Sequence, residues 1–100
     1  MDNNLVPHRA AEYEDGYIWF YCPGCETHHR IKKGPWDYNG DPVKPTFHPS
    51  VMVTYGDSKK CHFFVSDGRI MYLTDTFHMY RGHTIDLPFL DDESSPKYVA

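Results

Sequence analysis

A pair of cysteines, Cys22 and Cys25, constrains the fold most, because a metal half-site needs further ligands from a distant part of the chain. A Cys-x-x-Cys turn can aim two thiolates at one tetrahedral ion. Redox dithiols share this spacing but normally precede a long helix in an α/β chain. Here the motif follows the strand-like run YIWFYC and precedes polar residues and two histidines. Metal binding is therefore favoured over a redox dithiol or incidental thiols.

The rest of the chain favours β structure. Aromatic residues make up 16% of the sequence, and aromatic and β-branched side chains favour strands. Pro45 and Pro49 limit the middle of the chain to edge or irregular structure. A short helical turn is expected at 75–81, and strands are expected at 17–22, 28–32, 50–55 and 83–87. The sequence predicts a mainly β fold, a small zinc-stabilised antiparallel β-sheet domain with little helix.

The clearest supersecondary element is a hairpin centred on Asp67-Gly68. An Asp-Gly pair between two β runs favours a type I′ turn. Side chains alternate between the faces of a strand, so Cys61 and His62 point to opposite faces. The register predicted from this turn pairs Ser66 with Arg69, Val65 with Ile70, His62 with Leu73 and Cys61 with Thr74.

The missing metal ligands are expected from Cys61, the third and last cysteine, and from one histidine. Structural zinc sites usually have four protein ligands. His62 adjoins Cys61 but points to the other face, whereas a short turn after the hairpin would bring His78 back over Cys61. His62 and His28 remain alternatives for the fourth position. The preferred zinc site is Cys22, Cys25, Cys61 and His78.

Four protein ligands would make this zinc structural, because catalytic zinc usually keeps a position open for water. An open hydrolytic site would instead need His62 and His78 with one thiol or Asp75, so His62 and Asp75 are the candidate catalytic residues. Asp75 could orient the ring of His78 or cap the turn that follows it.

Covalent catalysis has less support from the sequence. Ser50 follows Pro49 without the sequence of a nucleophile elbow, so a serine nucleophile is not expected. Cys61 beside His62 is a possible thiolate nucleophile. The chain contains neither a His-Glu-x-x-His motif nor a Gly-rich phosphate loop.

The bulk properties indicate a single domain over residues 1–100, with an ordered core at about 13–90, a loose N-terminal leader and an acidic tail. The three cysteines are an odd number and argue against a disulfide framework. No apolar run approaches the roughly 20 residues of a membrane span, and the first residues lack signal-peptide features. We expect a cytoplasmic protein with reduced thiols.

Four segments in a fixed order carry a family resemblance: WFYCPGC, then W-x-x-N-G, then KPTFHPSVMV, then CHFFVSDGRIMYLTDTFHMYRGHTIDLP. Over roughly residues 17–88 the chain resembles a family of small phage and prophage proteins. Some members carry an ammonia monooxygenase label, which a short chain without membrane spans does not support. Related domains occur in bacterial operons for ubiquitin-like conjugation, which implies a role in phage–host conflict and, for this chain, the host cytoplasm.

The resemblance supports metal binding but supplies no established activity. His48 departs from the family pattern, which commonly has Ser there, so His48 is not expected to be a ligand. The motif positions fall on Cys22, Cys25, Trp36, Asn39, Pro45, Thr46, Pro49, Ser50, Cys61, His62, Asp67, Gly68, Asp75, His78, Gly82 and Thr84.

Two functions follow from the sequence. The favoured one is a zinc-binding phage-type accessory protein with a structural Cys3His site, which acts by binding a host or phage protein. The alternative is a metal-dependent hydrolase with His62, Asp75 and His78 near the ion. Ten basic and 14 acidic residues give a net charge of −4, which disfavours nucleic acid as a partner.

Overall fold

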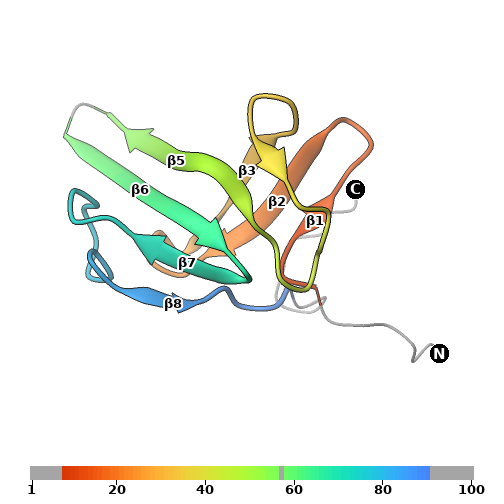
Figure 1. Ribbon diagram of the computed structural model, residues 1–100. Helices are drawn as coiled ribbons and strands as arrows, with labels where there is room; N and C mark the ends of the chain where they lie inside the picture. Colours follow the sequence, from red (N-terminus) through yellow and green to blue (C-terminus); the bar gives the residue numbers. More distant parts are fainter. Residues whose placement is uncertain (1–7, 57, 91–100) are drawn as a thin grey trace.

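The part of the chain that the structure describes forms eight strands in two antiparallel sheets (Figure 1). The computed structural model describes residues 8–56 and 58–90, and within these ranges it contains no helix, hence none long and apolar enough to cross a membrane. The mainly β class is confirmed, whereas most of the expected leader and all of the acidic tail from Asp91 lie outside the described residues. The strands are β1 (Ala11–Glu12), β2 (Tyr17–Cys22), β3 (Thr27–Lys32), β4 (Asp37–Tyr38), β5 (Phe47–Tyr55), β6 (Lys59–Ser66), β7 (Arg69–Tyr72) and β8 (Thr84–Asp86).

The two sheets share one aromatic core. The first sheet has the order β1-β2-β3 and the second the order β4-β5-β6-β7-β8. Alternate side chains of β2 and β6 are buried, as expected where one face of each strand meets the core. Phe20 of the first sheet contacts Phe47 and Phe63 of the second, with ring centroids 5.4 and 5.8 Å apart. Aromatic side chains therefore join the two sheets at Phe20.

The β6–β7 hairpin matches the predicted register, with Val65 opposite Ile70. Asp67 and Gly68 both have positive φ, 53° and 80°, which is the geometry of a type I′ turn. The ladder ends at Phe63, and beyond it the Leu73 N–H donates to the His62 carbonyl at 2.8 Å. His62 and Leu73 are thus neighbours, as predicted.

The segment after β7 is a series of turns, so the helical turn expected at 75–81 is not formed. Its backbone forms isolated turns, such as the bond from the Arg81 N–H to the His78 carbonyl at 3.1 Å. It also bonds to β6, where the Phe77 N–H donates to the Lys60 carbonyl at 2.9 Å. We call residues 74–78 the metal loop, because they include His78, one of the predicted metal ligands.

The proline-containing segment is more regular than predicted. Strand β5 begins at Phe47 and continues through Pro49, and its register against β6 shifts between Phe47 and Val51. Strand β4 pairs only with residues 47–48, and Pro49 and Ser50 lie within the register shift, between the positions at which β5 is paired with β6. An irregular stretch at an edge tolerates proline because no ladder hydrogen bond is lost there.

Candidate functional site

The structure brings the four preferred metal ligands together. Cys22 ends β2, Cys25 lies in the turn that follows, Cys61 is on β6 and His78 is in the metal loop. Their ligand atoms all lie within 4.8 Å of one another. The other described histidines, including the alternatives His28 and His62, are not part of this cluster.

The spacing suits one four-coordinate ion. The Sγ atoms of Cys22 and Cys61 are 3.9 Å apart, and Cys61 Sγ lies 3.3 Å from His78 Nε2. A metal–sulfur bond of about 2.3 Å, as in zinc sites, gives a tetrahedral sulfur–sulfur edge of about 3.8 Å. These two separations are therefore close to those that a tetrahedral site requires.

Two residues that the sequence did not single out support this cluster. The Tyr72 hydroxyl lies 3.1 Å from Cys22 Sγ, and hydrogen bonds to a ligating sulfur tune and orient it. The His78 ring packs directly over Gly24, where an added Cβ would lie 2.0 Å from Cε1. The alternation of side chains along the strands could have identified Tyr72, because it places this residue on the same face as Cys61. The contact of Gly24 with His78 could not have been predicted without knowing the position of the metal loop.

The thiols strongly influence one another. Hydrogen bonds, above all with Cys61, lower the pKa of Cys22 to about 3. The pKa of Cys61 is raised, first by its hydrogen bond to Cys22 and then by burial, and burial raises the pKa of Cys25. Three thiolates this close repel one another unless a cation lies between them. A bound metal ion, which keeps coordinating thiols deprotonated, fits this donor set.

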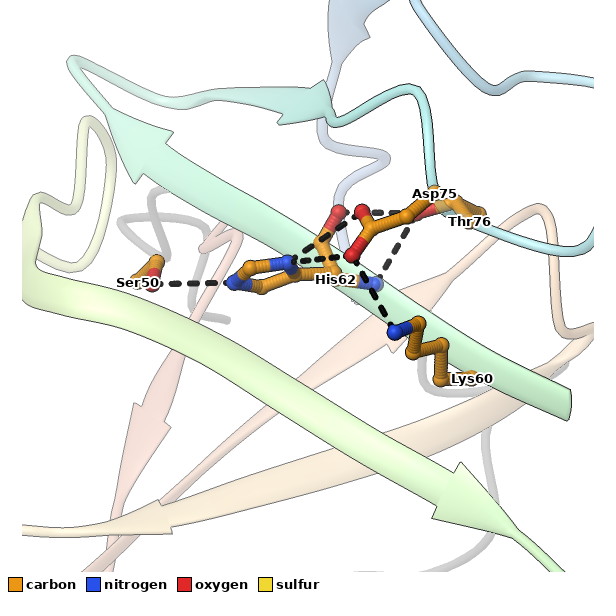
Figure 2. Close-up of polar contacts among 5 residues, drawn as sticks. All are labelled: Ser50, Lys60, His62, Asp75 and Thr76. Atoms are coloured by element: carbon orange, nitrogen blue, oxygen red, sulfur yellow. Dashed lines mark hydrogen bonds and ion pairs between the residues drawn. The ribbon is translucent and has the colours of Figure 1, made fainter. Parts of the chain in front are cut away.

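A second polar group lies on the opposite face of β6 (Figure 2). The Oγ of Ser50, from β5, is 3.2 Å from His62 Nε2. On the other side of the imidazole, His62 Nδ1 lies 3.2 and 3.1 Å from the two carboxylate oxygens of Asp75. Serine, imidazole and carboxylate thus form one continuous chain of contacts.

The electrostatics define the direction of these hydrogen bonds. The hydrogen bond with His62 lowers the pKa of Asp75, and Lys60, 3.5 Å away, acts in the same direction. An ionised carboxylate only accepts hydrogen bonds, so His62 Nδ1 donates to it. Nε2 is then free to accept the Ser50 hydroxyl proton, the arrangement that activates a serine nucleophile.

Contacts to the backbone hold two of the three residues in place, His62 and Ser50. The Thr76 Oγ1 accepts from the His62 N–H at 2.9 Å and donates to the His62 carbonyl at 2.8 Å. The Ser50 carbonyl, on β5, accepts a hydrogen bond from the Trp36 indole Nε1–H at 3.2 Å. Serine and histidine are thereby each held at the backbone as well as by each other.

This arrangement corrects two expectations. Ser50 contacts a histidine although it lacks the sequence of a nucleophile elbow. The pairing of β5 with β6, and not an elbow, brings its side chain next to His62. Asp75 hydrogen-bonds to His62 and not to His78. The two predicted catalytic candidates, His62 and Asp75, do lie together, but their third partner is a serine and not the metal cluster.

Fold and site define a small β protein with a Ser-His-Asp arrangement on one face of β6 and a Cys3His cluster on the other. The family model described as bacterial ubiquitination-like system serine protease (BubE) matches residues 2–73. The chain belongs to this family. Ser50 and His62 lie within the matched residues, and Asp75 lies just after them. No curated protein and no solved structure matches the chain.

Proposed function

We propose that the protein is a serine hydrolase, with Ser50 as nucleophile, His62 as general base and Asp75 as the group that orients His62. The observation that carries this proposal is the unbroken set of contacts from Ser50 Oγ through the His62 ring to the Asp75 carboxylate. The family description, a serine protease, supports the same chemistry.

The reaction follows from the positions of the protons. Ser50 Oγ attacks the substrate carbonyl carbon while its proton passes to His62 Nε2, and the imidazolium is stabilised by the Asp75 carboxylate. His62 then gives the proton to the leaving amine, so the amide bond breaks and an acyl-serine remains. A water molecule, deprotonated by His62, hydrolyses the acyl-serine and restores the free hydroxyl.

For the substrate, we propose an amide bond at the C-terminus of a ubiquitin-like protein. The family description places its members in a ubiquitination-like system, and conjugation of such a modifier joins its terminal carboxyl to an amine. The exposed Met52 lies opposite His62 in the β5–β6 ladder, and the exposed Met71 lies on the same face opposite Phe64. These apolar side chains flank the serine–histidine pair and suit an extended peptide tail.

The metal in this proposal is zinc, and its role is structural. Three thiolates and an imidazole are a common structural zinc donor set, and four protein ligands leave no position for a catalytic water. The metal-dependent hydrolase predicted as an alternative is therefore less well supported, because His62 and Asp75 contact Ser50 and lie outside the ligand cluster. The predicted host or phage protein partner stays a prediction, as does the cytoplasmic location.

The test is turnover of two substrates: p-nitrophenyl acetate, and a bacterial ubiquitin-like protein extended at its C-terminus by a short peptide. The wild-type protein is expected to hydrolyse both, and Ser50→Ala to lose at least about 1,000-fold in kcat/KM, because no other group replaces the nucleophile. Ser66→Ala, at the exposed end of the hairpin, is the matched control and should retain activity. Full activity in a folded Ser50→Ala protein would refute the proposal.

A further inference from the structure

We propose that His78 is a positioning residue for catalysis: its bond to the metal holds Asp75 against His62. The inference rests on the proposed function, since it assigns a role within the same triad. It differs from a general stabilising role, because His78 is the one ligand carried by the loop that also carries Asp75.

The two centres share the same two chain segments. On β6, Cys61 faces the metal cluster while its neighbour His62 faces Ser50. On the metal loop, His78 faces the cluster while Asp75, three residues earlier, contacts His62. Each segment thus contributes one residue to the metal centre and one to the triad, so a displacement of one centre moves the other.

The metal loop is held by turn and side-chain hydrogen bonds and not by a strand ladder. It is a sequence of turns without a strand partner, and the Asp75 side chain is 42% exposed. Between Asp75 and His78, the loop is attached to β6 by hydrogen bonds of Thr76 and Phe77 to the β6 backbone. The metal bond of His78 would close the far end of this loop and fix the distance between its chain and β6.

Loss of His78 should have a different effect on the structure from loss of a cysteine ligand. Cys22 and Cys25 belong to the first sheet and its turn, and Cys61 to the second sheet. Three thiolates can therefore keep the ion, and with it the junction of the sheets, when the imidazole is lost. Loss of His78 should then release the metal loop alone.

The experiment compares His78→Ala with His78→Cys in the full zinc-loaded chain. His78→Ala is expected to remain folded with one zinc per chain and to lose the downfield NMR signal of the His62 Nδ1–H. Its kcat should fall about 100-fold with little change in KM, as expected for a displaced catalytic group. His78→Cys supplies a fourth thiolate and should restore the signal and most of kcat. Rates are measured above a Ser50→Ala background.

Two outcomes would overturn the inference: a zinc-loaded His78→Ala protein that keeps the His62 signal and its kcat, or a His78→Cys protein that binds zinc without restoring them. Should His78→Ala not fold, His78→Gln replaces it; its side chain has about the length of the imidazole but is a poor zinc ligand, so the loop loses its bond to the ion and the His62 signal should change. An unaltered signal in that variant would also refute the role. The signal reports on the loop even if Ser50 proves not to be the nucleophile, so the two proposals can fail separately.

Discussion

Asp75→Asn is expected to lower kcat for acyl transfer by about 1,000- to 10,000-fold while the protein stays folded and keeps its metal. The Asp75 carboxylate accepts the hydrogen bond from His62 Nδ1. An amide can instead donate to this nitrogen, which would leave the proton on Nε2 and block proton transfer from Ser50. Steady-state kinetics with p-nitrophenyl acetate, together with circular dichroism and metal content, measure the effect.

The matched control is Asp86→Asn. Asp86, on β8, is an exposed carboxylate that pairs with Arg69 of β7 at 3.4 Å and contacts neither Ser50 nor His62. An exposed ion pair of this kind contributes little to stability, so the variant should stay folded and have wild-type kcat. An Asp75→Asn protein as active as Asp86→Asn would show that the contact between Asp75 and His62 has no catalytic role.

Cys22→Ser is expected to lose the metal and to unfold at room temperature. Cys22 ends a strand of the first sheet and Cys61 lies on a strand of the second, so an ion bound by both would link the two sheets through the buried core. Structural zinc contributes roughly 10–16 kcal/mol in zinc-finger peptides, whereas a whole domain is stable by only about 5–15 kcal/mol. Metal analysis and thermal melting followed by circular dichroism measure the change.

His83→Ala is the control for this variant, because His83 is exposed and lies outside the cluster. It should bind one metal per chain and melt like the wild type. In the cobalt-substituted wild-type protein, intense sulfur-to-metal absorption should indicate three thiolate ligands. A metal-free Cys22→Ser protein with a cooperative melting transition near that of the wild type would contradict the structural role.

The metal cluster could be predicted because the chain has only one cysteine besides the Cys-x-x-Cys pair, and because the turns beside the ligands follow local rules. The Cys-x-x-Cys spacing defines one half, and the Asp67-Gly68 turn fixes the register that leaves His78 close to Cys61. Each step needs only short-range rules for turns and strand alternation. The same rules placed Cys61 and His62 on opposite faces, which is why two centres are found along one strand.

The serine could not be predicted in the same way. Its contact with His62 depends on the pairing of β5 with β6 and on the register shift between Phe47 and Val51. Pro45 and Pro49 suggested a break in regular structure, whereas the strand continues through Pro49. Strand pairing across an irregularity is decided by the packing of the whole sheet, so the proximity of Ser50 to His62 emerges only in the folded chain.

The central claim, that Ser50 is the nucleophile, is tested most directly by covalent labelling of the zinc-loaded protein with a fluorophosphonate, followed by peptide mapping in a mass spectrometer. Such a reagent phosphonylates an activated serine hydroxyl and leaves ordinary serines unmodified. We predict one adduct per chain, located on Ser50, and none in Ser50→Ala. An adduct on another residue, or no adduct on the folded, metal-loaded protein, would contradict the assignment.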